Sequence, residues 1–381
     1  MKPLIPNTYV LNNKYLQSIL SPSTDIIDYN FTADQIHKLN LLQILRPDIY
    51  FNKKLSDDEF YDISKNYYQK LIQDEIIYKS EKDYFLYRID SDSHYQTGLI
   101  SLLNIQDYLN YNIKPHEKIL VSKGKERADQ LSKVKFQLCP IYLFYDDNSI
   151  DLNLDIHHDK KPIIKFQSGK YVHSIYKTKT DFSGINFKEL FVADGHHRIE
   201  GFAQLDVKKD TKFLAIVFPK SKCLNLAYNR SVKFPLSYNK ENFLNDLEKF
   251  FLVDELKYHE NIERFFVIYF KGKFLKIDLK DDFTSYGADC IDFAEFILKE
   301  ILNIEDETND ERVTFVPPTL GTEYLINQVD TGINDISTLM RPVSMDLVIE
   351  YSKNKKFMPP KATWFEPKPL DGLFFYNILD N

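Results

Sequence analysis

The sequence contains few cysteines and no pattern that would organise them. Its 381 residues include 3 cysteines, Cys139, Cys223 and Cys290. Their odd number and wide spacing fit neither a disulfide framework nor a zinc site. We therefore expect buried, reduced thiols in a cytoplasmic protein.

Long apolar runs and an excess of basic charge are also missing. No segment approaches the length of a transmembrane helix, and residues 1–17 hold no continuous apolar stretch of signal-peptide length. The formal net charge is −7. A chain of this charge has no overall positive field that draws it to nucleic acid or to an anionic membrane. We expect no nucleic-acid or membrane partner, and the sequence does not predict an oligomeric state.

The hydrophobic content of 43% is enough for a substantial core, and the chain length suggests two or three structural units. Residues 57–74 carry apolar side chains at intervals of three or four, which predicts an amphipathic helix. A hairpin is expected from residues 84–89 and 96–103, and a buried strand from 212–218. Further helices are expected over 31–49, with a break at Leu45-Arg46-Pro47, and over 122–134, 241–251, 289–302 and, after the cap Ser344, within 341–351. Further strands are expected over 140–145, 163–167, 172–177, 265–270 and 274–279.

The densest polar chemistry lies in the segment Asp194-Gly195-His196-His197-Arg198. An apolar run of strand length precedes it and apolar residues at helical spacing follow it, which predicts a strand-to-helix turn. Glycine permits a tight backbone there, and the first turn of a helix offers unpaired N–H groups and a positive dipole end. The guanidinium of Arg198 suits phosphate or carboxylate. The segment therefore predicts an anion site, and phosphate is the commonest such anion.

A structural interpretation of the same segment stays open. Asp194 would cap the helix, and Arg198 would pair with Glu200 or another surface carboxylate. We favour the anion site because capping needs one of the five residues. The other histidine pair, His157-His158, lies in the acidic segment 151–159 and is interpreted as part of a solvated surface loop.

Two further polar segments are candidate companions of the turn. Glu117 and Lys118 follow His116 and the helix-disfavouring Pro115. Lys361 lies in a proline-rich tail, next to Pro360. Basic residues on proline-stiffened loops serve phosphate groups, although a solvated loop explains either segment equally well.

The order of the motifs resembles a bacterial family catalogued as a domain of unknown function, DUF1015. The blocks that carry this resemblance are Gln96-Thr-Gly-Leu99, His116-Glu-Lys118, residues 140–147, Ala193-Asp-Gly-His-His-Arg198 and residues 358–368. They span nearly the whole chain. One departure is that a Thr-His-Arg-like block of the family stands here as Tyr228-Asn-Arg230, and the missing histidine argues against a shared role for that block.

The Asp-Gly-His-His-Arg block is further similar to the nucleotide-binding turn of the ParB/sulfiredoxin-like superfamily. Members use this turn to hold nucleotide phosphates for peroxiredoxin repair, for CTP-driven clamp closure or for phosphorylation of free serine. Sulfiredoxin chemistry needs a cysteine in the turn, and positions 195–198 hold none. DNA partition is disfavoured by the acidic balance and by the lack of a clear helix-turn-helix pattern. Free serine kinases are the nearest precedent that remains.

The resemblance implies an α+β fold with a mixed-sheet ParB/sulfiredoxin-like core and additional N- and C-terminal α/β elements. The expected division is an N-terminal region at 1–110, the core with the turn at 111–235, and a C-terminal region at 236–381 whose proline-rich tail returns to the site. The implied activity is phosphoryl transfer to a small hydroxyl substrate, free L-serine, with ATP or ADP and Mg²⁺. The competing hypotheses are a nucleotide-switched binding protein without transfer chemistry, and a metal-dependent hydrolase with Asp194 and the histidines as ligands.

The resemblance also implies roles for single residues. The residues assigned to nucleotide phosphates are Gly195, His196, His197, Arg198, Lys118 and Lys361. Asp194 would orient a histidine, coordinate Mg²⁺ or act as the general base. Glu117 is the alternative base, and His196 completes the candidate catalytic set.

Overall fold

The computed structural model describes residues 1–20, 37–118, 121–147, 150, 152, 161–205, 210–257 and 264–379. The chain forms two compact units, which we call unit 1 and unit 2. Unit 1 comprises Met1–Pro115, Ile119–Cys223 and Pro367–Asn381, and unit 2 comprises His116–Lys118 and Leu224–Glu366. The expected division at 110/111 and 235/236 stays a prediction. His157, His158 and the first six residues of the helix expected over 31–49 lie outside the described residues.

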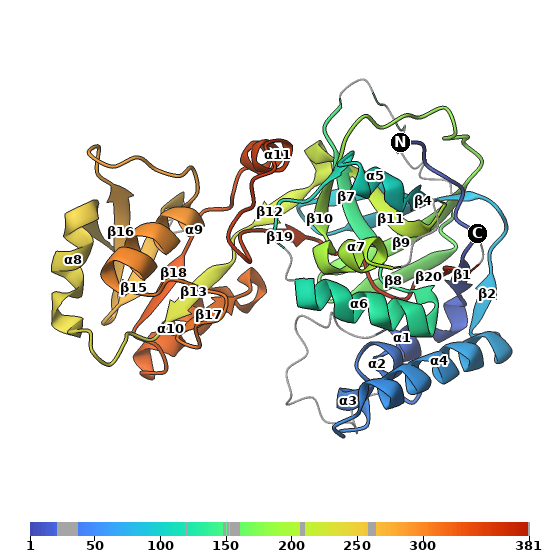
Figure 1. Ribbon diagram of the computed structural model, residues 1–381, viewed down its shortest axis with the longest axis horizontal. Coiled ribbons are helices and arrows are strands. Elements are labelled where there is room, and N and C mark those ends of the chain that lie inside the picture. The colour runs from blue at the N-terminus through green and yellow to red at the C-terminus, as the bar shows by residue number, and fades with distance from the viewer. Residues whose placement is uncertain are drawn as a thin grey trace. The chain divides into compact units, whose positions relative to one another are not determined.

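Unit 1 is built around an eight-stranded sheet (Figure 1) with the strand order β5-β10-β7-β11-β4-β3-β9-β8. Its strands are β3 (Tyr84–Asp90), β4 (Tyr95–Asn104), β5 (Ile113–Lys114), β7 (Ile141–Tyr145), β8 (Ile164–Ser168), β9 (Tyr171–Thr178), β10 (Leu190–Asp194) and β11 (Lys212–Pro219). The pairs β5/β10 and β7/β11 are parallel, and the other pairs are antiparallel. This mixed sheet, together with the helices, confirms the α+β class; the ParB/sulfiredoxin-like assignment of the core stays a prediction.

The core of unit 1 holds the turn at residues 194–198 in place. Leu99, Val192 and Val217 are fully buried in the sheet, and Ile199 and Phe202 of α7 (His196–Ala203) belong to the same apolar cluster. Ile199 and Phe202 are three residues apart and therefore lie on one face of the helix. Because this face packs on the sheet, the start of α7 is fixed at the end of β10.

α7 also packs against α6 (Val121–Val134), and the two helices lie side by side (Figure 1). Gly201 makes this approach possible. A Cβ atom at Gly201 would lie 2.7 Å from Cβ of Arg127 on α6, which is closer than real Cβ contacts come. Both the sheet and α6 thus restrain α7.

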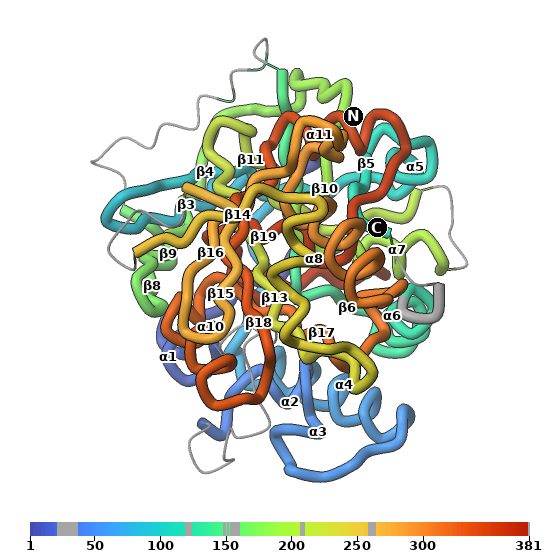
Figure 2. The backbone as a smooth tube through the Cα atoms, turned by 90° about the vertical axis from the view of Figure 1, so that its left-hand side faces the viewer, coloured from blue at the N-terminus to red at the C-terminus, as the bar shows by residue number. Residues whose placement is uncertain are grey.

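The N-terminal helices of unit 1 form a small group (Figure 2) of α2 (Leu42–Leu45), α3 (Pro47–Tyr50) and α4 (Asp57–Gln73). α4 confirms the helix expected over 57–74, and Ser56 and Glu59 form its capping box. The break expected at Leu45-Arg46-Pro47 is confirmed, but the helix expected before it is wrong at residues 37–41, which are not helical. Arg46, at φ −148° and ψ 65°, separates α2 from α3 because the residue before Pro47 is kept out of helical geometry.

A second sheet of unit 1 joins the two ends of the chain in the order β2-β1-β20-β6. Its strands are β1 (Tyr9–Leu11), β2 (Ile77–Lys79), β6 (Phe136–Gln137) and β20 (Phe374–Asn377); η1 (Asn13–Tyr15), α1 (Leu16–Ile19), α5 (Ile105–Leu109) and η3 (Lys220–Lys222) complete the unit. β20 pairs with both β1 and β6. The C-terminal segment is therefore fixed in unit 1.

Unit 2 contains a six-stranded antiparallel sheet in the order β14-β16-β15-β18-β13-β17 and a two-stranded sheet of β12 and β19. The strands are β12 (Leu224–Leu226), β13 (Asn229–Val232), β14 (Phe251–Leu256), β15 (Val267–Phe270), β16 (Lys273–Leu279), β17 (Val313–Val316), β18 (Ile336–Leu339) and β19 (Trp364–Glu366). The helices are η4 (Lys240–Asn242), α8 (Phe243–Phe250), α9 (Asp289–Asp292), the π-helix η6 (Phe293–Ile301), η7 (Pro318–Leu320), α10 (Gly321–Asp330) and α11 (Met345–Lys353).

Helices cover both faces of the six-stranded sheet. Successive side chains of β15 point to opposite faces, and both faces are apolar. Tyr269 belongs to an apolar cluster with Leu325 of α10, whereas Phe270 packs against Phe243 of α8. The predicted cap is confirmed as well, since the Ser344 side chain accepts a hydrogen bond from the backbone N–H of Leu347. Within the described residues, no helix is both long enough and apolar enough to cross a membrane.

Candidate functional site

Gly195 forms the junction between β10 and α7, at the position where the sequence predicts a strand-to-helix turn. Its backbone adopts φ 100° and ψ 25°, a left-handed conformation that favours glycine. A Cβ atom there would lie 3.0 Å from Nε of Arg198 and 3.2 Å from Cδ1 of Ile141. The conformation therefore favours glycine at this position, and a larger residue would also displace the Arg198 side chain.

The structure does not support the interpretation of Asp194 as a helix cap. Gly195 is the N-cap residue of α7, and it makes no side-chain cap hydrogen bond. Asp194 lies one residue earlier, at the end of β10, where the register with β7 shifts between Val192 and Asp194 and pairs Asp194 with Tyr142. Such a bulge changes the direction of a side chain at the end of a strand. The Asp194 carboxylate is thereby free to interact with other side chains of the turn.

Four charged side chains meet at this turn, and we call them the charge quartet: Asp194, Arg198, Lys368 and Asp371. Oδ2 of Asp194 accepts a hydrogen bond from Nη2 of Arg198. Oδ1 of Asp194 accepts a second one, of 2.9 Å, from Nζ of Lys368. Nη1 of Arg198 lies 3.6 Å from Oδ1 of Asp371. All four side chains are between 19% and 30% exposed, so solvent reaches the quartet.

Arg198 thus pairs with Asp194 of the turn and with Asp371 of the C-terminal segment. Glu200 accepts hydrogen bonds from Tyr108 Oη at 2.9 Å and from Gln204 Nε2 at 3.0 Å. Its carboxylate is engaged with α5 and with the later part of α7. The expected pairing of Arg198 with a carboxylate is met by Asp194 and Asp371, and its pairing with Glu200 stays a prediction.

The ionisation of Asp194 follows from these neighbours. Burial acts to raise the pKa of its carboxyl, but the charges of Lys368, Arg198 and His196 and the hydrogen bond from Lys368 outweigh burial and hold the pKa well below its ordinary value. A carboxylate with a lowered pKa is a weak proton acceptor. The geometry is therefore better suited to orienting the two cations than to removing a proton.

The histidines of the turn lie in different surroundings. His196 begins α7 and is buried, with 5% of its surface exposed, whereas His197 is half-buried. The charge of His196 contributes to the low pKa of Asp194, so its ring lies close to that carboxylate. Asp194, Gly195, His196, His197 and Arg198 are thus brought together in unit 1, as their adjacency in the sequence requires.

The C-terminal segment Pro367–Asp371 is attached to the sheet by two buried polar side chains. Nε2 of Gln96 donates to the carbonyl oxygen of Pro367 at 2.8 Å, and Oε1 of Gln96 accepts from the Tyr142 hydroxyl at 3.0 Å. The backbone N–H of Leu370 donates to the hydroxyl oxygen of Tyr87 at 3.0 Å. These bonds alternate along the segment with Lys368 and Asp371, which turn toward Asp194 and Arg198.

Two cysteines of unit 1, Cys139 and Cys223, have raised thiol pKa values. Burial raises the pKa of the Cys139 thiol well above its ordinary value, and Asp371 raises it further. Burial also raises the pKa of Cys223 to about 12. All three cysteines are free thiols, as expected, but only Cys290 is fully buried; Cys139 and Cys223 are half-buried.

The other predicted site residues, Glu117, Lys118 and Lys361, belong to unit 2. Glu117 forms a parallel bridge with Met358, so the segment with Glu117 lies beside the proline-rich tail. Lys118 is exposed and Glu117 half-buried. The structure therefore gathers these three residues in one unit and the Asp-Gly-His-His-Arg turn in the other.

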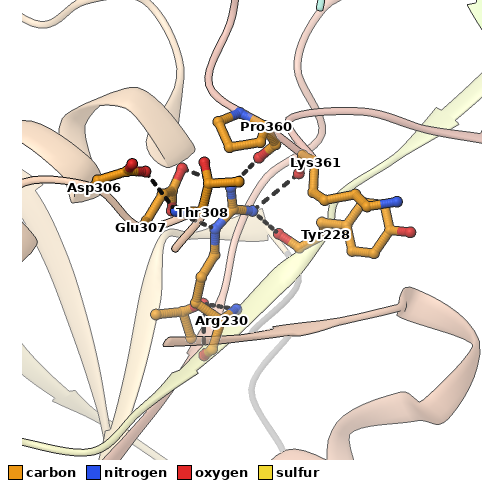
Figure 3. A network of polar contacts seen from close by, with 8 residues as sticks. Tyr228, Arg230, Asp306, Glu307, Thr308, Pro360 and Lys361 are labelled. Atoms are coloured by element: carbon orange, nitrogen blue, oxygen red, sulfur yellow. Dashed lines mark hydrogen bonds and ion pairs between the residues drawn. The ribbon is translucent and has the colours of Figure 1, made fainter. Parts of the chain in front are cut away.

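Arg230 fixes the backbone at Lys361 (Figure 3). Its guanidinium donates to the carbonyl oxygens of Tyr228 at 2.9 Å, Pro360 at 3.1 Å and Lys361 at 3.1 Å. Arg230 is 0% exposed and forms an ion pair of 3.3 Å with Glu307. Lys361 itself adopts a left-handed φ of 54° and places Nζ 5.4 Å from the centre of the Tyr228 ring. Arg230 of the altered Tyr228-Asn-Arg230 block thus stabilises the backbone of the proline-rich tail.

Sequence reasoning missed Lys368, Asp371, Gln96 and Tyr142. Lys368 closes the same proline-rich block as Lys361, so the composition of the tail indicated a lysine at the site but not which of the two. Asp371 has no motif around it. Gln96 and Tyr142 lie in blocks that the family resemblance rests on, and their positions in those blocks were the available signal.

The described residues do not form a resident metal site. Among them, no three His, Cys, Asp or Glu side chains gather in a way that could hold a metal ion. Each oxygen of Asp194 already accepts a hydrogen bond from a cation. The assignment of Asp194 as an Mg²⁺ ligand stays a prediction, because Mg²⁺ at phosphate sites uses one or two carboxylates rather than a group of three side chains.

The fold and the site together define an α+β protein in which two cations, Arg198 and Lys368, meet at a strand-to-helix turn. The sequence matches the family described as "Protein of unknown function (DUF1015)" over residues 3–304. The chain belongs to this family. No curated protein matches it.

Solved structures give weaker similarities. A free serine kinase in complex with AMP is 14% identical, with a TM-score of 0.40 over 72% of this chain and 92% of that chain. A conserved hypothetical protein from Pyrococcus furiosus is 13% identical, with a TM-score of 0.40 over 74% and 96% of the two chains. SbnI with a C-terminal truncation, from Staphylococcus aureus, is 13% identical, with a TM-score of 0.40 over 71% and 85%. Similarities of this size do not decide the activity of this chain, which has to be argued from its own residues.

Proposed function

We propose that the protein is a nucleotide-dependent phosphotransferase that acts on a small hydroxyl substrate, with ATP or ADP as the donor and free L-serine as the acceptor. The observation that carries the proposal is the left-handed Gly195 at the start of α7 with the guanidinium of Arg198 beside it. The resemblance of this motif to the phosphate-binding turn of the ParB/sulfiredoxin-like superfamily supports a nucleotide as the ligand.

Phosphate binding in this proposal uses three kinds of donor. The first turn of α7 presents backbone N–H groups behind Gly195, an N-cap residue that has no side chain, and the helix dipole favours negative charge there. Arg198 supplies a planar fork of donors that matches two phosphate oxygens. His196 and His197 are the remaining donors of the turn. Phosphoryl transfer depends chiefly on positioning and on charge neutralisation, and these groups provide both.

The acceptor hydroxyl must lose a proton during transfer, and the general base is a separate part of the proposal. The lowered pKa of Asp194 weakens its case as the base. Glu117 is the alternative. Asp194→Asn and Glu117→Gln distinguish them, because loss of the base lowers kcat and changes the dependence of kcat on pH, whereas loss of a binding group raises KM. Mg²⁺ would enter with the nucleotide phosphates, since the described residues form no group of three side chains that could hold it alone.

Detection of O-phosphoserine by mass spectrometry after incubation with ATP or ADP and serine tests the proposal. Arg198→Ala should lower product formation at least tenfold, because a charge-assisted bond contributes about 1.5–3 kcal/mol. Arg312→Ala is a matched control, since Arg312 is also paired with an aspartate, Asp310, but lies in unit 2. Unchanged product formation in a folded Arg198→Ala protein would rule the proposal out.

A second candidate is a nucleotide-switched binding protein without transfer chemistry. The observation that favours it is the pairing of Asp194 with two cations, which leaves the turn able to hold an anion but without a basic carboxylate of its own. Nucleotide binding that depends on Arg198, with no phosphorylated product from any amino acid offered, would select this candidate.

A further inference from the structure

The segment Pro367–Asp371 brings one positive and one negative side chain to the turn. Lys368 donates to Asp194 at 2.9 Å, and Asp371 lies 3.6 Å from Arg198. The quartet therefore contains two cations and two carboxylates, and its formal charge is balanced. The two cations lie on either side of one carboxylate, because Lys368 and Arg198 bind different oxygens of Asp194.

Hydrogen bonds to residues next to Lys368, outside the quartet, fix the position of Lys368. The Gln96 side chain holds the carbonyl oxygen of Pro367, and the Tyr87 hydroxyl holds the N–H of Leu370. Gln96 is 0% and Tyr87 1% exposed, so these bonds are shielded from water. Binding an anion then requires little additional ordering of the segment, and preorganisation of this kind strengthens binding.

Asp371 has the weakest link in the quartet. Its contact with Arg198, at 3.6 Å, is an ion pair without hydrogen-bond geometry, whereas the two bonds to Asp194 are hydrogen bonds. A phosphate oxygen that approached Nη1 of Arg198 would meet the charge of Asp371 on the same nitrogen. Like charges repel at such distances, so Asp371 and an anionic ligand compete for one donor.

We infer that Lys368 is a further phosphate-binding residue of this site and that Asp371 is an intramolecular competitor for the same anion. The inference rests on the proposed function for the identity of the ligand, a nucleotide phosphate. It adds two residues to the site, both from a segment more than 170 positions away in the sequence.

Calorimetric titration of the full chain with ADP, and separately with inorganic phosphate, tests the inference. Lys368→Met should weaken ADP binding about tenfold or more, because it removes a charge-assisted contact. Asp371→Asn should tighten it about threefold, because the competing charge is removed and the shape is kept. Lys165→Met and Asp92→Asn are matched controls, since both residues are exposed in unit 1 away from the quartet and should leave the affinity unchanged.

Lys368→Met and Asp371→Asn must change the affinity for ADP in opposite directions. Equal affinity in all variants, weaker binding in Asp371→Asn, or no binding of ADP and phosphate by the unmodified protein each overturns the inference. Thermal unfolding of each variant shows whether a loss reflects unfolding, and the gain expected for Asp371→Asn does not arise from unfolding at all.

The phosphoserine assay separates this inference from the proposed function. ADP binding with the predicted responses, but without any phosphoserine, supports the inference and rejects serine phosphorylation. Phosphoserine formation with the same affinity and rate in Lys368→Met supports the proposed function and rejects the inference.

Discussion

The hydroxyl oxygen of Tyr87 lies 2.7 Å from Nδ1 of His173, within the interior of unit 1. The same oxygen accepts the backbone N–H of Leu370, so the single hydroxyl proton is available to His173. In the neutral ring that carries its proton on Nε2, Nδ1 of His173 accepts this hydrogen bond. The protonation of one buried histidine is thereby linked to the segment that carries Lys368 and Asp371.

Acid should destabilise the protein through His173. Burial lowers the pKa of His173 from its ordinary 6.5 to about 4. The unfolded chain takes up the proton at the higher pH, so the stability contributed by the neutral ring is fully present above pH 6.5 and is lost as the pH falls through about 4. The loss is roughly 3 kcal/mol at most.

Denaturant unfolding at pH 7 and at pH 4.5 measures this contribution. His173→Gln should unfold with a smaller difference between the two pH values than the unmodified protein. His94→Gln is the control, because His94 is only half-buried and bonds to the carbonyl oxygen of Lys222. An identical pH dependence in His173→Gln and the unmodified protein would show that His173 does not contribute.

Tyr87→Phe should loosen the C-terminal segment without removing any charge. The N–H of Leu370 and Nδ1 of His173 lose their shared partner, and unpaired buried groups cost about 1–3 kcal/mol each. Amide hydrogen exchange at residues 367–373 should become faster. Tyr78→Phe, an exposed residue of β2, should leave exchange there unchanged; faster exchange in both variants would contradict a specific role for Tyr87.

Gly195→Ala should impair both stability and anion binding. The new Cβ meets a left-handed φ of 100° and atoms of Arg198 and Ile141. Backbone strain of this kind costs about 1–3 kcal/mol, and relief of the contact moves Arg198. Gly169→Ala is the matched control, since Gly169 also has a positive φ, 56°, but no atom within 4 Å of the added carbon.

The comparison of these two glycine variants separates strain from crowding. Both should lose stability in thermal unfolding, and only Gly195→Ala should lose affinity for ADP. Equal affinity of the two variants for ADP would mean that the turn does not take part in binding.

Arg230→Met should destabilise unit 2 strongly. The substitution leaves Glu307 buried without its cation and three carbonyl oxygens without their donor. Removal of one partner of a buried ion pair costs about 3–5 kcal/mol. Adding Glu307→Gln should restore part of the loss, because the uncompensated charge disappears. Arg312→Met, a half-exposed pair with Asp310, should cost under about 1 kcal/mol, as equilibrium unfolding would show.

Local sequence patterns predicted the elements whose formation depends on interactions between residues close in the sequence. The amphipathic spacing of residues 57–74, the hairpin of β3 and β4 and the cap at Ser344 all depend on neighbours within a few positions. The turn at Gly195 was predictable for the same reason, because its function as a strand-to-helix junction follows from five consecutive residues. The break at Pro47 was predictable from the same local rule, whereas the helix expected before it is absent from residues 37–41.

Long-range pairing was not predictable from one sequence. Lys368 meets Asp194 because β20 pairs with β1 and because Gln96 and Tyr87 hold the intervening segment. No local pattern encodes that approach, and the two lysines of the tail look alike in the sequence. The orientation of the Glu200 side chain was not predictable either, since it depends on a hydrogen bond from Tyr108 of a different helix.

The pairing of β1 with β20 has a consequence for the order in which the molecule is made. Tyr9 is hydrogen-bonded in register with Phe375, so unit 1 cannot be closed until the ribosome has released the last strand of the sheet. Unit 2, whose main segment is Leu224–Glu366, is synthesised before that strand. During translation the early strands of unit 1 therefore stay without one of their pairing partners. Exposed strand edges of this kind favour aggregation, and nascent chains depend on chaperones to prevent it.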